Sequence, residues 1–198
     1  MRESRGGEEE GLLGSSYFVD HMPVATDSVV AMLNFDMVGR MRAGKLIVFG
    51  AATATEFPSL LASANTADLK LTAQGDGFGP SDHSSFYAKN IPVLHFFTDS
   101  HEDYHKASDT PDKINAAGEA QVVALAERVA RSIADADKRP TYVRVAAPAP
   151  ISSREGGDVY LGSIPDMAGS ETPGLRLTGV RAGSPAELGG LKPGDIIV

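Results

Sequence analysis

Three short segments of the chain carry the side-chain types that bind metal ions and transfer protons. They are the acidic run GEEEGLLGS at 7–15, the sequence NFDMVG at 34–39 and the polar sequence YHKASDT at 104–110. The chain has no cysteine, so any metal ion must be held by His, Asp or Glu side chains. Such ligands suit zinc, although cobalt and manganese accept them as well. These segments are therefore the candidates for a metal site.

Each segment also has a simpler explanation when it is considered alone. An acidic triplet is usually the solvated start of a helix, where carboxylates complement the helix dipole. An aspartate at the end of a buried strand, such as Asp36, is usually a hydrogen-bond acceptor, and a single histidine in a polar loop usually lies on the surface. By the same reasoning, His21 is expected on the surface, and His95, inside an apolar run, is expected to be a hydrogen-bonded core residue.

The apolar pattern predicts the elements that must position these segments. Runs of β-branched and apolar residues predict strands at 29–35, 45–49, 69–72 and 91–97. Helical spacing and start signals predict helices at 55–64, 82–89 and 116–136. Strands that alternate with helices give an α/β unit, in which ligands gather beyond the carboxyl ends of the strands. We therefore expect Asp36 and the loop at 98–114 to meet at one end of a sheet.

The composition changes after the last predicted helix. Prolines, paired glycines and serines become frequent from residue 138 onward and indicate a linker. Short β-type pieces follow, at 159–161, 175–180 and 195–198. The predicted organisation is an α/β domain at 1–145, a linker at 146–156 and a small, incomplete β-rich domain at 157–198.

Together and in this order, the segments resemble the zinc-dependent M28 peptidases, which are aminopeptidases with two metal ions in one site. The sequences GPSDHSSF at 79–86 and SDTPDKI at 108–114 add to a resemblance that covers 7–137. It implies part of a zinc-peptidase-like mixed sheet flanked by helices, and hydrolysis of the N-terminal bond of a peptide or protein substrate. Two zinc ions would activate a water molecule, and a carboxylate would pass its proton to the leaving amine.

The resemblance also implies roles for single residues. Glu8 would be the general base, and Tyr104 would stabilise the developing oxyanion. The implied metal ligands are Glu9, Asp36 and His105. Adjacent glutamates divide this labour because their side chains point in different directions.

Two aspartates near these residues have open alternatives. Asp82 either supports the metal site or caps a helix, and Asp109 either orients His105 or closes a turn. In the family, a His and an Asp upstream of the glutamate pair complete the metal sites, and only residues 1–6 precede the motif at 7–15 here. Since a catalytic zinc ion typically has three protein ligands, weak or absent zinc binding is expected. Unpaired strand edges beside 29–35 would also favour self-association.

The β-rich part resembles a bacterial-type PDZ domain, on the sequences VYLG at 159–162 and VRAGSPAELGGLKPGDII at 180–197. Such domains bind an extended peptide as an added strand and hold its terminal carboxylate in a nest of backbone N–H groups. The implied peptide-binding residues are Tyr160, Leu161 and Gly162. The sequence stops before the helix that forms the other wall of the groove, so impaired peptide binding is expected. A plain β-hairpin with Gly-Pro turns is the alternative.

The overall composition restricts the classes of function. The chain of 198 residues is 42% hydrophobic and 22% charged, which is typical of a soluble globular protein. Its net charge of -8, without a Lys/Arg-rich stripe, argues against nucleic acid as a partner. No apolar run approaches the roughly 20 residues of a membrane span. Localisation is not encoded in the chain, although the resemblance suggests a periplasmic or secreted protein.

Two other functions fit the same residues. One is a non-catalytic, peptidase-like scaffold that presents a PDZ surface to a partner, although the presence of all four of Glu8, Glu9, Asp36 and His105 favours an enzyme. The other is a glutaminyl cyclase of the same superfamily, which uses one zinc ion and similar residues. Release of the amine from aminoacyl anilides, compared with cyclisation of a glutaminyl peptide, separates the cyclase from the peptidase.

Overall fold

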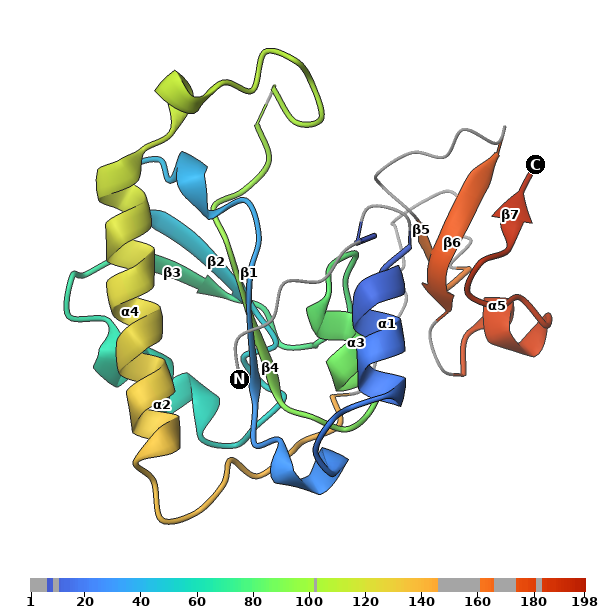
Figure 1. The fold of residues 1–198 in the computed structure, drawn as a ribbon, viewed down its shortest axis with the longest axis horizontal. Coiled ribbons are helices and arrows are strands. Elements are labelled where there is room, and N and C mark those ends of the chain that lie inside the picture. Colours follow the sequence, from blue (N-terminus) through green and yellow to red (C-terminus); the bar gives the residue numbers. More distant parts are fainter. Residues whose placement is uncertain (1–6, 9–10, 102, 146–160, 166–173, 181–182) are drawn as a thin grey trace, which may run out of the picture.

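Four strands of the first domain form one mixed sheet (Figure 1). The computed structural model describes residues 7–8, 11–101, 103–145, 161–165, 174–180 and 183–198. In sheet order, the strands are β1 (Met32–Phe35), β4 (Val93–Phe97), β2 (Lys45–Phe49) and β3 (Lys70–Ala73). β1 is parallel to β4 and β2 is parallel to β3, whereas β2 and β4 are antiparallel. The mixed α/β architecture predicted from the sequence is confirmed.

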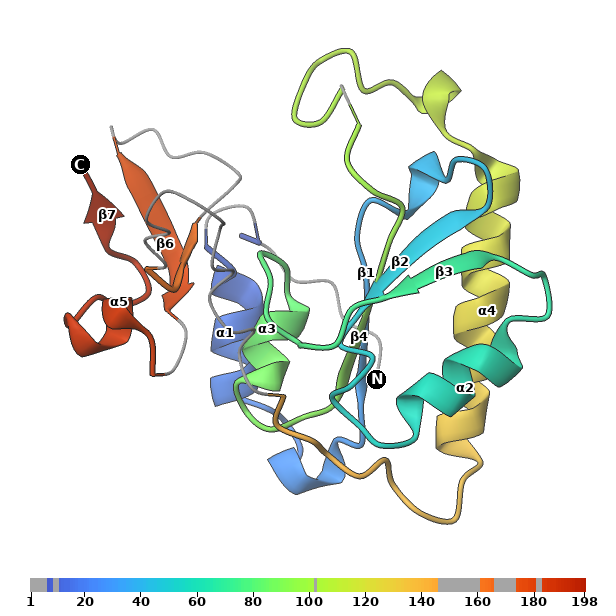
Figure 2. The same cartoon turned by 180° about the vertical axis from the view of Figure 1, so that it is seen from behind.

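Helices cover both faces of this sheet (Figures 1 and 2). On one face lie α2 (Phe57–Ala64) and α4 (Ala116–Ala134), which contact each other. On the other face lie α1 (Leu13–Asp20) and α3 (His83–Tyr87), and α3 contacts both β1 and β4. Short 3-10 helices lie in the connections: η1 (Thr26–Ser28), η2 (Val38–Arg40) and η3 (Pro111–Lys113). Asp36 lies between the end of β1 and η2.

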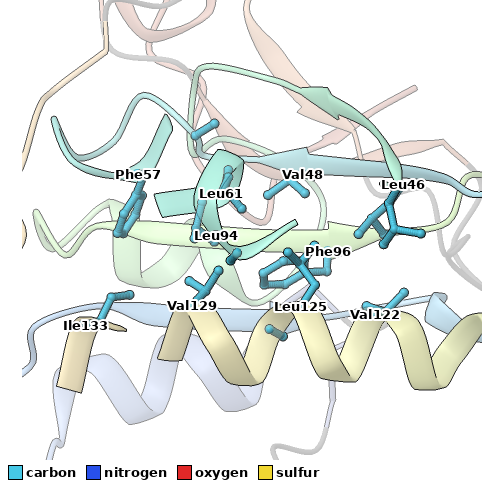
Figure 3. Close-up of a cluster of buried hydrophobic side chains, with 14 of the residues drawn as sticks. Leu46, Val48, Phe57, Leu61, Leu94, Phe96, Val122, Leu125, Val129 and Ile133 are labelled. Carbon is cyan, nitrogen blue, oxygen red and sulfur yellow. The ribbon is translucent and has the colours of Figure 1, made fainter. Parts of the chain in front are cut away.

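The main apolar core lies between the sheet and the pair α2 and α4 (Figure 3). β4 contributes Leu94 and Phe96, and both side chains are completely buried. α4 contributes residues at helical spacing: Val122, Leu125, Val129 and Ile133. The helix begins where the side chain of Asn115 accepts a hydrogen bond from the backbone N–H of Gly118. The predicted apolar face of this helix is thus the face that packs on the sheet.

Gly50 marks the point where β2 ends against the start of β4. Its φ is +80°, and a Cβ atom at this position would lie 2.1 Å from the carbonyl oxygen of Val93. The hydroxyl of Thr53 lies 2.7 Å from the carbonyl oxygen of Gly50 and accepts a hydrogen bond from the backbone N–H of Val93 at 2.9 Å. The two backbones therefore pack directly on each other, with no room for a side chain between them.

The predicted elements differ from the structure mainly at their ends. β1 begins at Met32 rather than at residue 29, and α4 ends at Ala134 rather than at 136. The pattern analysis does not predict α1, although its two buried residues, Ser15 and Val19, have the four-residue spacing of a helix face. Ser15 is polar, which hides that face from an analysis of apolar periodicity.

The β-rich part forms a small antiparallel sheet of its own. It contains β5 (Ser163–Pro165), β6 (Leu175–Val180) and β7 (Ile196–Ile197), in that order, and a short helix α5 (Pro185–Leu188). β6 has the predicted bounds, and β7 is shorter than predicted. Most of the strand predicted at 159–161, and the linker predicted at 146–156, lie outside the described residues.

Among the helices that the structure describes, none combines the length and the apolar composition needed to cross a membrane.

Candidate functional site

A cleft of about 230 Å³ lies beyond the end of β1 that carries Asp36. Asp36 lines one part of it, and Ser100 and Tyr104 of the loop at 98–114 line another. The structure therefore brings Asp36 and this loop together, as the sequence predicts. The remaining wall is mostly aromatic or apolar and is formed by Met37, Phe49, Phe78, Phe97 and neighbouring residues. Within the described residues, Glu8 and His105 are not among the side chains that line this cleft.

A directional chain of hydrogen bonds holds the carboxylate of Asp36. Ser81 Oγ donates to Asp36 Oδ2 at 3.0 Å, and Asn34 Nδ2 donates to Ser81 Oγ at 2.8 Å. Asn34 Nδ2 also lies 2.8 Å from Nδ1 of His95, its partner in the register of β1 and β4. An amide nitrogen only donates, so Nδ1 of His95 must accept and the ring proton must be on Nε2. Asp36 is thereby linked to one defined tautomer of a buried histidine.

The rings of His83 and His95 stack beside this chain. Their centroids are 4.4 Å apart and their planes differ by 7°. Burial lowers the pKa of His95 to about 4, and burial together with the neighbouring His95 lowers the pKa of His83 to about 3. Both rings are therefore neutral at pH 7, and the wall of the cleft that they form carries no charge. The prediction that His95 is a hydrogen-bonded core residue is confirmed.

These two rings make the stability of the fold depend on pH. An unfolded histidine has a pKa of about 6.5, so below this pH the unfolded chain binds protons that the folded rings do not. The stabilisation is fully present above about pH 6.5, and each ring removes up to about 1.4 kcal/mol per pH unit as the pH falls further. Urea unfolding between about pH 7 and pH 5 measures this slope. The variant His95→Gln should reduce the slope of the unfolding free energy against pH, and the exposed control His21→Gln should not. Equal slopes in the parent and both variants would show that His95 does not cause the pH dependence.

Removing the hydroxyl of Ser81 should destabilise the fold by about 1–3 kcal/mol, because the buried amide of Asn34 would lose one of its two acceptors and Asp36 would lose a donor. Ser81→Ala tests this in a urea unfolding experiment. The matched control is Ser59→Ala, since the exposed hydroxyl of Ser59 donates to the carbonyl of Glu56 in its own turn and its loss should cost less than about 0.5 kcal/mol. Similar losses in the two variants would show that the chain to Asp36 is not a stabilising unit.

The loop at 98–114 carries Tyr104 and His105, whose rings stack at a centroid distance of 3.8 Å. Both side chains are exposed, and Tyr104 reaches the cleft. His105 has a φ of +54°, in the left-handed region that non-glycine residues seldom adopt. Such a conformation costs on the order of 1 kcal/mol or more and persists only where the surroundings enforce it. The loop must therefore be held by contacts on either side of this residue.

Those contacts converge on Asp103, the residue before Tyr104. Its carboxylate accepts hydrogen bonds from Lys113 Nζ at 2.6 Å, from Ser108 Oγ at 2.7 Å and from an Arg40 guanidinium nitrogen at 3.2 Å. The hydrogen bond from Lys113, followed by that from Ser108, holds the pKa of Asp103 well below its ordinary value. The carboxylate of Asp103 is therefore ionised in the folded protein at neutral pH.

The other residues predicted near the site have varied positions. Asp109 is ion-paired with Arg40, and its backbone N–H closes a turn onto the carbonyl of Lys106 at 3.0 Å. Asp82 lies at the N-cap position of α3, but its side chain makes no capping hydrogen bond, and within the described chain its buried Oδ1 has no hydrogen-bond partner. Glu8 lies before α1, and its carbonyl accepts the N–H of Leu12 at 2.9 Å. Glu9 lies outside the described residues.

The donor types near the cleft suit zinc, because Asp36 offers carboxylate oxygen and His105 offers imidazole nitrogen. The number of such donors, however, is too small for a zinc site. Across the ranges that the structure describes, no three His, Asp or Glu side chains lie close enough together to hold a metal ion. The described residues thus do not form a zinc site by themselves.

Several residues of the site are absent from the sequence predictions. Asn34 and Ser81 hold Asp36, and Arg40 holds the loop of Tyr104. A signal for Asn34 exists, since it is an amide inside an apolar strand, and buried amides require partners. No local pattern identifies Arg40, because its partners lie more than 60 positions away in the chain.

Known proteins share both the sequence and the fold of this region. Leupeptin-inactivating enzyme 1 of Streptomyces exfoliatus is 31% identical over 109 residues, which are 54% of this chain and 24% of that protein. The LapA aminopeptidase of Legionella pneumophila is 28% identical with a TM-score of 0.57, over 68% of this chain and 38% of that one. The aminopeptidase of Aneurinibacillus sp. strain AM-1 is 27% identical with a TM-score of 0.56, over 73% of this chain and 34% of that one.

A third solved structure is BSAP, a zinc aminopeptidase from Bacillus subtilis, which is 25% identical with a TM-score of 0.54. That match covers 65% of this chain and 34% of the Bacillus chain. The chain thus spans about a quarter of the length of the curated relative and little more than a third of the solved ones. Residues 4–130, more than half of the chain, match peptidase family M28. The chain belongs to peptidase family M28.

Proposed function

We propose that this chain carries the substrate cleft of an aminopeptidase that removes N-terminal residues with apolar side chains. The observation that carries the proposal is the meeting of Asp36 and Tyr104 at one cleft whose wall contains Met37, Phe49 and Phe97. A carboxylate beside an apolar pocket suits a free α-amino group with an apolar side chain attached, because the charge and the side chain each find a matching surface. Family membership and the aminopeptidases among the similar structures support this assignment.

In the proposed reaction, water attacks the first carbonyl carbon of the substrate. Glu8 takes a proton from this water and passes it to the nitrogen of the leaving amine as the C–N bond breaks. For this role its side chain, which does not line the cleft in the structure, must reach the attacking water. Tyr104 donates a hydrogen bond to the oxyanion of the tetrahedral intermediate, which suits a phenol at the mouth of the cleft. Asp36 and the loop of His105 face the same region, and the hydrogen-bond chain through Ser81 fixes the orientation of the carboxylate.

Zinc is proposed as the metal ion because a similar solved structure is a zinc aminopeptidase. Glu9 and His105 are the proposed ligands of one zinc ion and Asp36 of a second, and zinc would supply a Lewis acid for the water and the carbonyl. With so few donors, we expect zinc to be held weakly and to be lost on dialysis. Metal analysis of the dialysed protein measures this, and two retained zinc ions per chain would refute the expectation.

The aminopeptidase proposal is tested with paired chromogenic substrates in the presence of excess Zn²⁺. Leucine p-nitroanilide should be cleaved, whereas N-acetyl-leucine p-nitroanilide, which lacks the free amine, should not. Glutamate p-nitroanilide should be cleaved more slowly than the leucine compound, because the wall of the cleft is apolar and its histidines are neutral. Equal rates on the free and the blocked substrate would exclude an exopeptidase, and no cleavage of either would exclude the activity for this chain.

A glutaminyl cyclase of the same superfamily is the alternative enzyme. It predicts cyclisation of glutaminyl-peptide substrates in place of release of p-nitroaniline from the leucine compound. Parallel assays with glutaminyl-alanine amide and leucine p-nitroanilide separate the two reactions, since each enzyme class acts on one of these probes.

For the β-rich part, we infer a peptide-binding module of the PDZ type. The supporting observation is the contact between its first described residues and its helix, in which the N–H of Ala186 donates to the carbonyl of Leu161 at 2.8 Å. This bond joins Leu161 to α5, the helix that begins at the Gly-Ser-Pro sequence at 183–185. Tyr160 lies outside the described residues. Titration with a peptide that has a free C-terminal carboxylate, compared with its amidated form, tests the inference; equal affinities would oppose it.

A further inference from the structure

The short helix η2 follows Asp36 closely in the chain. Both ends of the loop at 98–114 are hydrogen-bonded to η2 or to the residue before it. At the start of the loop, the hydroxyl of Thr98 donates to the carbonyl of Met37 and accepts the backbone N–H of Arg40 at 3.3 Å. At the end of the loop, the backbone N–H of Asn115 donates to the carbonyl of Gly39 at 2.8 Å. The ends of the loop are therefore fixed to η2 by bonds that involve backbone atoms.

Among the described residues, the side chain of Arg40 attaches the middle of the loop to η2, and Arg42, two residues later, donates to the carbonyl of Ser100 at 2.7 Å. The guanidinium of Arg40 donates to Asp103 at 3.2 Å and forms a second ion pair with Asp109. The side chain of Arg40 is 17% exposed and that of Asp103 is 10% exposed, so this pair is largely shielded from water. Water and salt screen a shielded ion pair of this kind less than they screen a surface pair.

We propose that Arg40 is a positioning residue that holds Tyr104 against the Asp36 side of the cleft. Tyr104 follows Asp103 directly, so a displacement of the Asp103 backbone also displaces Tyr104. Asp36 lies four residues before Arg40, on the segment that ends in η2. The guanidinium of Arg40 therefore adds a link between the two parts of the chain that form the cleft, besides the bonds at the ends of the loop. The relevance of this geometry to catalysis rests on the aminopeptidase function proposed above, whereas the geometry itself does not.

Charge neutralisation alone does not explain this arrangement. Lys113 already supplies a cation to Asp103 at 2.6 Å, so the carboxylate would remain paired without Arg40. What Arg40 adds is one guanidinium nitrogen, Nη2, that reaches two carboxylates, Asp103 and Asp109, from outside the loop. The ammonium nitrogen of a lysine lies one bond nearer the backbone than Nη2, so it falls short of this position. Arg40→Lys therefore keeps the charge and shortens the reach, which separates a positioning role from an electrostatic one.

The first experiment measures the position of the loop in the full chain without any ligand. Because the chain has no cysteine, Ala62→Cys on α2 and Lys106→Cys in the loop give two unique sites for spin labels, and both residues are exposed. Pulsed dipolar spectroscopy then gives the distribution of distances between the labels. We expect one narrow distribution with Arg40, a distribution about twofold broader with Arg40→Met, and an intermediate width with Arg40→Lys.

The control variant is Arg131→Met, which removes an arginine–carboxylate pair of the same chemistry from an exposed face of α4. Its distance distribution should match that of the parent. Circular dichroism shows whether each variant is folded. An Arg40→Met distribution as narrow as that of the parent would overturn the inference, as would an Arg40→Lys distribution identical to the parent's.

The second experiment connects the position of the loop to the cleft. The methyl signal of Met37 in ¹³C-methyl-methionine protein reports on the cleft that this residue lines, and leucinamide is the probe. We expect leucinamide to shift this signal in the parent and in Arg131→Met, with an affinity about tenfold lower in Arg40→Met. If the spin-label distribution broadens in Arg40→Met while leucinamide shifts Met37 in no variant, the positioning role stands and the aminopeptidase proposal fails.

Discussion

Phe96→Ala is expected to lower the free energy of unfolding by about 3–5 kcal/mol, which is the largest effect on stability of any substitution considered for this protein. Phe96 lies on β4, an inner strand of the sheet, and its side chain is completely buried among residues of β2, α2 and α4. Removing the ring leaves a cavity in a core that is closed on all sides. Urea unfolding followed by circular dichroism measures the loss.

The matched control for this prediction is Phe35→Ala. Phe35 is the partner of Phe96 in the register of β1 and β4, and the two rings stack at a centroid distance of 5.1 Å. Phe35, however, is 46% exposed, so truncating it leaves no closed cavity and should cost about 1 kcal/mol. Similar losses for the two residues would mean that ring stacking, rather than burial, provides the stabilisation at this position.

Glu8→Gln is expected to lower kcat for leucine p-nitroanilide by about 10²–10⁴-fold, provided that the parent chain cleaves this substrate. The substitution keeps the size of the side chain but removes the carboxylate that is proposed to carry a proton from water to the leaving amine. KM should change little, since the proposed role of Glu8 is in proton transfer and not in substrate binding. Initial rates over a range of substrate concentrations separate these two parameters.

Glu127→Gln provides the control for this activity measurement. Glu127 is an exposed glutamate on α4 that pairs with Arg131, and it lies on an element that does not line the cleft. Its replacement changes the net charge of the chain by the same amount as Glu8→Gln. A comparable loss of kcat in Glu127→Gln would attribute the effect to charge, and an active Glu8→Gln protein would remove Glu8 from the proposed mechanism.

The sequence predicted the elements well wherever apolar residues recur with one clear period. β2 and β6 have the predicted bounds, and α4 packs by the predicted face. α1 was missed because one of its two buried positions is the polar Ser15, which bonds to Ser85 across the helix pair at 3.0 Å. Apolar periodicity does not predict a helix whose buried face includes a hydrogen-bonded polar residue.

The candidate site was predictable only in part, for a different physical reason. The carboxyl end of a strand and the following loop converge in an α/β unit, and this rule places Asp36 and Tyr104 at one cleft. The groups that fix them cannot be deduced in this way. Arg40 reaches Asp103 and Asp109 only after the chain has folded, and Ser81 lies between Asn34 and Asp36 for the same reason. Such contacts depend on side-chain geometry and not on spacing in the sequence.

The close approach of Gly50 to Val93 makes the carboxylate of Asp36 sensitive to a residue that does not itself line the cleft. A methyl group at position 50 would have to push the carbonyl of Val93 away, since its carbon would lie only 2.1 Å from that oxygen. Val93 and His95 belong to the same strand, so that push would also move the imidazole from the amide of Asn34. A search for loss-of-function variants in this protein should therefore find some at a glycine that touches neither substrate nor any proposed catalytic group.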